Sequence, residues 1–165
     1  MTAICHIGLG ANLDHPAAQI AWALRALAAL PATRLDAAAP LYRSRAVGPQ
    51  PQPDYLNTVA RLRTGLGPRE LLRYLHELEA ARGRVRGERW GPRPLDLDIL
   101  LYGEYCVAEA DLVIPHPRLG ERSFVLAPLH DLDPGLRLPD GTAVADLLAR
   151  AGHAGIVRVS FWGMP

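Results

Sequence analysis

The sequence predicts an α+β fold, a ferredoxin-like βαββαβ sandwich with an antiparallel or mixed sheet, helices on its faces and added C-terminal elements. The main observation is the order of apolar periodicities, which runs strand, helix, two strands, helix, strand. The second is the length, because 165 residues without an internal repeat suit one domain, 1–165, that needs no disulfide or metal staple. The 15 glycines and 15 prolines, spread through the chain, predict tight turns between these elements.

Each element is predicted from its own apolar pattern. Alternation indicates the strands, and apolar residues three and four positions apart indicate the helices, two of which open at Pro16 and Pro68. Asp14 is suited to cap the first helix. The expected strands are 4–9, 34–43, 55–63, 95–102 and 156–161, with extended pieces at 105–108 and 112–117, and the expected helices are 16–30, 68–82, 124–132 and 143–151. The second and third strands are expected to pair antiparallel, and the loop 44–54 between them contains three prolines that can shape a pocket.

Charge and composition exclude several classes of function. The 18 basic and 17 acidic residues give a formal charge of +1, so the chain lacks the global field of a nonspecific nucleic-acid or membrane binder. Every basic residue is arginine, which excludes the P-loop lysine, the protein-kinase strand lysine and Schiff-base catalysis. Cys5 and Cys106 lie in separate apolar runs, which predicts two buried, reduced thiols. The N-terminus lacks a basic leader and a long apolar segment, which predicts a cytoplasmic protein.

The segment 83–98 has the strongest chemical signal, because an arginine-rich loop leads into a strand with an Asp-x-Asp pattern. Its arginines and the one before it supply planar forks that match phosphate oxygens: Arg82, Arg84, Arg86, Arg89 and Arg93. Asp96 and Asp98 are two positions apart on the strand, so their carboxylates point to one face, about 6 to 7 Å apart at the backbone. Carboxylate oxygens suit Mg²⁺ between protein and polyphosphate. The alternative is a surface network in which both aspartates pair with these arginines.

Three segments carry a resemblance to a known family. Residues 48–57 read GPQPQPDYLN, residues 84–98 read RVRGERWGPRPLDLD, and residues 114–126 read IPHPRLGERSFVL. Together, and in consistent order between residues 8 and 128, they resemble the 6-hydroxymethyl-7,8-dihydropterin pyrophosphokinases. The resemblance implies an ATP-dependent diphosphotransferase of folate biosynthesis, which transfers diphosphate from ATP to the hydroxymethyl group of 6-hydroxymethyl-7,8-dihydropterin and releases AMP.

The resemblance also implies a role for individual residues. The catalytic residues would be Arg84, Arg93, Asp96 and Asp98, and the two aspartates would coordinate two Mg²⁺ ions. The pterin-binding residues would be Ser44, Val47, Tyr55, Asn57, Trp90 and Phe124. The ATP-binding residues would be His76, Glu79, Arg86, Arg93, Ile99, His116 and Arg122. ATP and the pterin are the expected partners, and we expect a monomer with no nucleic acid, membrane or obligatory protein partner.

The chain departs from the family pattern at four places, which bear on rate and loop closure: Ala11, Arg45, Pro117 and a loop one residue short at Gly87. Two other functions use similar features. A ferredoxin-like RNA-binding module would present stacking aromatics and basic loops, but the strands lack its aromatic-rich signature and the two aspartates would repel phosphate unless a metal intervened. A two-metal nucleotidyltransferase would use the same carboxylates but release diphosphate instead of AMP.

Overall fold

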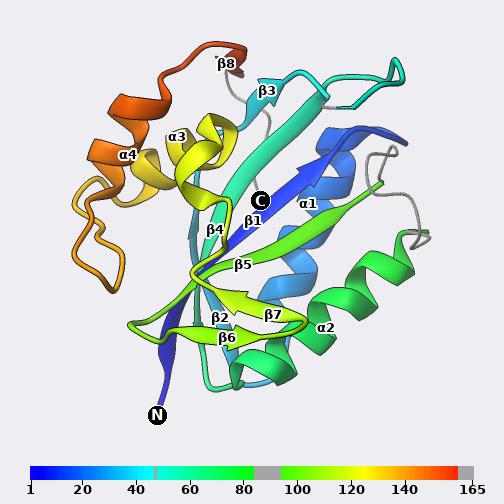
Figure 1. The fold of residues 1–165 in the computed structure, drawn as a ribbon. Helices are drawn as coiled ribbons and strands as arrows, with labels where there is room; N and C mark the ends of the chain where they lie inside the picture. The colour runs from blue at the N-terminus through cyan, green and yellow to red at the C-terminus, as the bar shows by residue number, and fades with distance from the viewer. Residues whose placement is uncertain (47, 84–93, 160–165) are drawn as a thin grey trace.

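The centre of the protein is a six-stranded antiparallel sheet with the order β5-β1-β4-β3-β8, in which β2 also pairs with β4 (Figure 1). The computed structural model describes residues 1–46, 48–83 and 94–159. Its elements are β1 (Ala3–Ala11), α1 (Pro16–Ala28), β2 (Thr33–Ala38), β3 (Tyr42–Ser44), β4 (Tyr55–Thr64), α2 (Pro68–Ala81), β5 (Asp96–Tyr102), β6 (Val107–Glu109), β7 (Leu112–Ile114), a 3-10 turn (Leu119–Glu121), α3 (Ser123–Leu132), α4 (Val144–Ala151) and β8 (Ile156–Arg158). The strand order and the alternation with α1 and α2 confirm the predicted α+β, ferredoxin-like fold.

Helices cover both faces of the sheet, but one face only in part (Figure 1). On the first face, α1 and α2 bury their apolar sides against the odd-numbered residues of β1, including Cys5, Ile7 and Leu9. On the second face, α3 and α4 form a smaller cluster with Val59 of β4 and Leu100 of β5. The hairpin of β6 and β7 lies beside this arrangement as a separate two-stranded sheet. The uncovered part of the second face is open and forms the floor of a cleft.

The first helix begins differently from the prediction. Pro16 occupies the first turn as expected, but the cap position is His15, in the left-handed region with φ of 61°, and no side chain caps the helix there. The predicted cap by Asp14 is therefore wrong. Asp14 also has positive φ, 54°, and its carbonyl oxygen accepts a hydrogen bond from Nε2 of Gln19 at 3.1 Å. A backbone turn and a buried amide thus fix the entry to α1.

Two predicted strands are changed by backbone irregularities. The expected strand 34–43 is split into β2 and β3, both paired with β4, and Pro40, which has no N–H to donate, lies in the break. Strict alternation over the expected strand 95–102 would place Leu101 in the core with Leu97, and Tyr102 on the face of Asp96 and Asp98. The register with β1 shifts between His6 and Ile7, so Leu101 instead joins the α3 and α4 cluster and Tyr102 joins the opposite core.

The remaining local predictions are largely confirmed, with two differences. Both thiols are free, and burial raises the pKa of Cys5 to about 12, but Cys106 is exposed, contrary to the prediction. The predicted C-terminal strand is described only as β8, and residues 160–161 lie outside the described residues. Within the described ranges, no helix combines the length and apolar character that crossing a membrane requires.

Two isoleucines of β1 test this arrangement of layers. Ile7 is fully buried, whereas Ile4 is 40% exposed. We expect Ile7→Ala to lower the free energy of unfolding by about 2–5 kcal/mol, because it leaves a cavity in the core, and Ile4→Ala to lower it by about 1 kcal/mol or less. Urea unfolding followed by circular dichroism measures both. Equal losses would contradict the assignment of these residues to different environments.

Candidate active site

A cleft of about 710 Å³ opens on the uncovered part of the sheet. Its floor is formed by β1, β4 and β5, and its walls by α2, the β6–β7 hairpin and the segment 116–125. The predicted site residues that line it are Ser44, Tyr55, Asn57, His76, Glu79, Asp96, Asp98, Ile99, His116, Arg122 and Phe124. Residues that are far apart in the sequence therefore meet in one cavity. The other predicted site residues, Val47, Arg84, Arg86, Trp90 and Arg93, lie outside the described residues.

The floor of the cleft depends on two glycines of β1. In the β1–β5 register, Gly8 is opposite Asp98 and Gly10 is opposite Asp96, and on the other side Gly10 is opposite Asn57 of β4. A Cβ atom on Gly10 would lie 3.2 Å from Oδ1 of Asn57, and one on Gly8 would lie 3.3 Å from Leu100. Glycine thus leaves a strip without side chains between the two carboxylates and the amide.

One end of the cleft is suited to a flat, hydrogen-bonding ring. Asn57 is 6% exposed, and its Nδ2 donates to Oγ of Ser44 at 2.9 Å, which fixes the orientation of the amide. Tyr55 lies two residues before Asn57 on β4, and Phe124 approaches from α3. Two aromatic side chains and an oriented amide can hold a heteroaromatic ring by stacking and by edge hydrogen bonds.

The carboxylates lie in a mixed electrostatic environment. Asp96 and Asp98 are both half-buried and line the cleft with His116 and Arg122. Burial, with a smaller contribution from Arg118, lowers the pKa of the Arg122 guanidinium, and the two carboxylates oppose this shift. The guanidinium stays charged, because arginine is effectively always protonated in proteins. The site therefore presents an anionic pair beside a fixed cation, which suits a polyphosphate only if further positive charge accompanies it.

His116 is held as a neutral hydrogen-bond donor. Burial lowers the pKa of His116, Arg122 and Arg118 lower it further, and Asp96 opposes them. The backbone N–H of Arg118 donates to Nδ1 of His116 at 3.2 Å, so the ring proton is assigned to Nε2. The imidazole can thus donate an Nε2–H to an anionic ligand without carrying a charge itself.

Glu79 has a structural contact that the sequence did not suggest. The side chain is 2% exposed, and its Oε2 accepts the backbone N–H of Leu97 at 2.8 Å. Leu97 is the residue between Asp96 and Asp98, so α2 is bonded directly to the middle of the Asp-x-Asp strand. A buried carboxylate that accepts a backbone hydrogen bond fixes that strand segment. Glu79 is therefore placed to position the aspartates.

The wall opposite the aromatic end contains residues that the sequence reasoning missed. Ala110 to Val113 of the hairpin line the cleft, and Arg69 of α2 holds this hairpin by donating to both carboxylate oxygens of Asp111, at 2.9 and 2.7 Å, and to Glu109. Leu72, Arg118 and Glu121 also line the cleft. Arg118 and Glu121 form an ion pair at 2.9 Å. Their spacing of three residues, close to His116, could have predicted this pair from the sequence. No sequence motif in the hairpin segment indicates that it lines the cleft.

Comparisons with known proteins agree with this geometry. The family model described as 7,8-dihydro-6-hydroxymethylpterin-pyrophosphokinase matches residues 6–134. A 2-amino-4-hydroxy-6-hydroxymethyldihydropteridine pyrophosphokinase of Pseudomonas aeruginosa is 50% identical over 154 residues, covering 93% of this chain and 95% of that protein. A protein of the same name from Haemophilus influenzae is 40% identical over 155 residues, covering 94% and 97%.

A solved structure supports the fold independently. The Plasmodium falciparum HPPK-DHPS protein, crystallised with pterin and p-hydrobenzoate, has a TM-score of 0.73 at 13% identity. The match covers 96% of this chain but only 48% of that one, so this chain spans about half of the fused protein. From the family match over most of its length and the identity to these relatives, the chain belongs to the 7,8-dihydro-6-hydroxymethylpterin-pyrophosphokinase family.

Proposed function

We propose that this chain transfers the terminal diphosphate of ATP to the hydroxymethyl group of 6-hydroxymethyl-7,8-dihydropterin and releases AMP, a step of folate biosynthesis. One observation carries the proposal: the Asp96 and Asp98 carboxylates line one cleft together with two aromatic side chains, an oriented amide, and the cationic or N–H-donating groups of Arg122 and His116. Membership of the pyrophosphokinase family and the names of the relatives support the same activity.

We also propose that Asp96 and Asp98 hold two Mg²⁺ ions. In the part of the chain that the structure describes, no group of three or more His, Cys, Asp or Glu side chains could enclose a metal. Mg²⁺ commonly binds through one or two carboxylates and completes its shell with substrate phosphates and water, so a two-carboxylate site fits. When bound, it would polarise phosphate oxygens and offset the negative charge of ATP.

The residues of the cleft have distinct tasks in this proposal. Tyr55 and Phe124 stack on the pterin, and Asn57 binds its hydrogen-bonding edge, which brings the hydroxymethyl oxygen toward the aspartates. Arg122 and the Nε2–H of His116 bind phosphate oxygens. The hydroxymethyl oxygen bonds to the β-phosphorus while the bond from this phosphorus to the bridging oxygen of AMP breaks, and the hydroxyl proton is released to water. Positioning and charge stabilisation supply most of the rate.

Further assignments rest on the family pattern alone. Val47 and Trp90 belong to the proposed pterin site, and Arg84, Arg86 and Arg93 to the proposed phosphate site, although all five lie outside the described residues. His76, Glu79 and Ile99 belong to the nucleotide end, where they line the cleft. We propose that the chain acts as a single domain, 1–165, and as a monomer, even though the Plasmodium falciparum structure joins HPPK to DHPS in one chain.

Product analysis tests the reaction. The protein is incubated with ATP, Mg²⁺ and 6-hydroxymethyl-7,8-dihydropterin, and the adenine nucleotides are separated by chromatography, with a parallel sample that lacks the pterin. We expect AMP, in amounts equal to the pterin consumed, only in the complete mixture. Free diphosphate with an adenylated pterin would indicate nucleotidyl transfer, and ADP would indicate transfer of a single phosphoryl group.

The carboxylate pair can be tested by isosteric replacement. We expect Asp96→Asn and Asp98→Asn each to lower kcat at least about a thousandfold, because several kcal/mol of metal-dependent charge stabilisation are lost. Glu104→Gln, in an exposed turn away from the cleft, is the control and should retain full activity. ATP binding is measured by calorimetry with and without Mg²⁺. Mg²⁺-dependent affinity that survives in both variants would contradict the metal role.

The contact of Glu79 with Leu97 predicts a difference between two substitutions. Glu79→Leu leaves a buried N–H without its acceptor, so we expect it to cost about 1–3 kcal/mol of folding free energy and at least about tenfold in kcat/KM. Glu79→Gln retains an oxygen acceptor and should lose less of both. Thermal unfolding and steady-state kinetics measure the two effects. Similar losses in both variants would show that the carboxylate charge, and not the hydrogen bond to Leu97, is what matters.

A further inference from the structure

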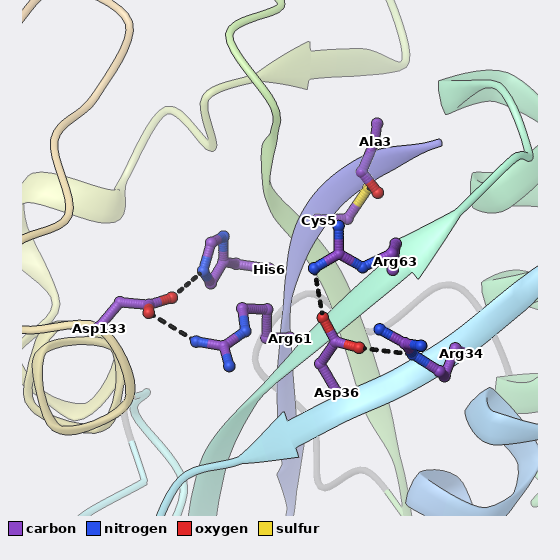
Figure 2. Close-up of polar contacts among 8 residues, drawn as sticks. All are labelled: Ala3, Cys5, His6, Arg34, Asp36, Arg61, Arg63 and Asp133. Carbon is purple, nitrogen blue, oxygen red and sulfur yellow. Dashed lines mark hydrogen bonds and ion pairs between the residues drawn. The ribbon is translucent and has the colours of Figure 1, made fainter. Parts of the chain in front are cut away.

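A polar cluster away from the cleft joins the C-terminal end of α3 to the sheet (Figure 2). His6 of β1 and Arg61 of β4 are directly opposite each other in the antiparallel register, so both side chains leave the same face. Asp133, the residue after α3, contacts both: Nε2 of His6 lies 2.6 Å from its Oδ2, and Nη1 of Arg61 donates to its Oδ1 at 2.6 Å. Residues from three parts of the chain therefore meet at one carboxylate.

The protonation of this cluster follows from its charges. Burial lowers the pKa of His6 and Arg61 adds to this, which outweighs the opposite effect of Asp133, so the ring is neutral at pH 7 and donates its Nε2–H to the carboxylate. His6 is only 3% exposed, and its Nδ1 is buried without a hydrogen-bond partner among the described residues. An apolar side chain in place of His6 would avoid the free-energy cost of a buried Nδ1 without a partner. It would, however, not fix the position of the helix along its axis. Two hydrogen bonds that converge on one carboxylate fix its position.

The end of α3 has a second polar anchor. The hydroxyl of Tyr42 in β3 donates to Oδ2 of Asp131 at 2.5 Å, and burial together with this carboxylate raises the pKa of Tyr42 to about 12. The backbone N–H of Asp133 donates to the carbonyl of Leu129 at 2.9 Å, which connects Asp133 rigidly to the last helical turn. The C-terminal end of α3 is thus bonded to β1, β3 and β4.

The other end of the same helix forms a wall of the cleft. Arg122 and Phe124, at the start of α3, line the cleft, and the guanidinium of Arg122 lies 5.8 Å from the centroid of the Phe124 ring. A ten-residue helix is about 15 Å long, so about three turns of backbone connect its two ends. The helix also packs in the apolar cluster with Val59 and Leu100, where its Leu126 is fully buried, so this packing sets its height above the sheet. The polar contacts at the C-terminal end add a directional constraint on the helix, and this constraint bears on where Arg122 and Phe124 lie.

We infer that His6, Arg61 and Asp133 are positioning residues that fix α3 on the sheet, and so place Phe124 and Arg122 for substrate binding. None of the three lines the cleft, so they act through the helix and not by touching substrate. The inference rests on the proposed pterin and phosphate roles of Phe124 and Arg122. It extends the functional site to a cluster at the far end of the helix.

Asp133→Ala tests this inference against a matched carboxylate. Asp36 also bridges two partners, Arg34 at 2.9 Å and Arg63 at 3.2 Å, but it connects β2 with β4 and does not contact α3 (Figure 2). We expect Asp133→Ala to raise KM for the pterin about tenfold with a smaller change in kcat, because a small shift of a positioning element costs binding geometry. Asp36→Ala should leave KM within about twofold. Equal changes in both variants would overturn the inference, since loss of any surface ion pair would then suffice.

Two substitutions of His6 separate positioning from general stability. His6→Leu removes the donor to Asp133 and should raise KM for the pterin as Asp133→Ala does. His6→Gln places an amide N–H near the Nε2 position, so KM for the pterin should stay close to that of the unsubstituted protein. The pH dependence of the thermal midpoint provides a second readout. Because the pKa of His6 is lowered in the folded state, its contribution to stability is lost as pH falls below about 6.5, and His6→Gln should lose less stability than the unsubstituted protein between pH 7.5 and 5.5.

Hydrogen exchange distinguishes failure of this inference from failure of the proposed function. Without any substrate, Asp133→Ala should increase amide exchange in residues 123–132 and leave α1 unchanged. If the unsubstituted protein makes no AMP but this exchange pattern appears, the proposed function is wrong and the anchoring of α3 stands. If AMP is made and neither KM for the pterin nor exchange in α3 changes in Asp133→Ala and His6→Leu, the inference is wrong.

Discussion

The functional site depends on the register that fixes β1 between β4 and β5. This register puts Gly10 between Asp96 and Asn57, and Gly8 beside Asp98. A shift of β1 by one residue would place Ile7 and Leu9 on the open face, and the same shift of β5 would turn the carboxylates into the core. The register is held by burial of the odd-numbered side chains of β1 under α1 and α2. The chemistry on one face of the sheet is therefore specified by the apolar packing on the other.

The same central strands explain why α2 and the hairpin contribute to the site. α2 packs against the core face, yet Glu79 at its C-terminal end reaches the backbone of β5 between the two aspartates. At the N-terminal end of α2, Arg69 holds the tip of the β6–β7 hairpin through Asp111. One helix thus supports both the strand that carries Asp96 and Asp98 and the hairpin wall of the cleft. Exposed ion pairs such as that of Arg69 add little stability, so their contribution here is to geometry.

Local sequence patterns were enough to predict the order of the elements and the Asp-x-Asp strand, whereas the other candidate site residues came from the resemblance to a family. The Asp-x-Asp strand and the proline-rich loop could be identified because each is a short, continuous pattern. The shifted register at His6, the exposure of Cys106 and the missing cap at Asp14 could not, because they depend on how strands align and on which turn the backbone adopts. The bond from Glu79 to Leu97 and the meeting of His6 with Asp133 join residues that only the tertiary fold brings together.

The open cleft and the buried polar cluster lie on the same face of the sheet, and the two features are related. A face that binds two substrates must leave part of its surface without packing, and here glycines provide that gap. The helix that borders the gap packs on the sheet through apolar residues such as Leu126 and Leu129, but apolar packing alone gives little fixation along the helix axis. Hydrogen bonds to Asp131 and Asp133 supply it at the opposite end, where the strands again carry polar side chains, Tyr42, His6 and Arg61. A directional polar contact suits this purpose better than apolar packing, because it fixes the helix along its axis as well as against the sheet.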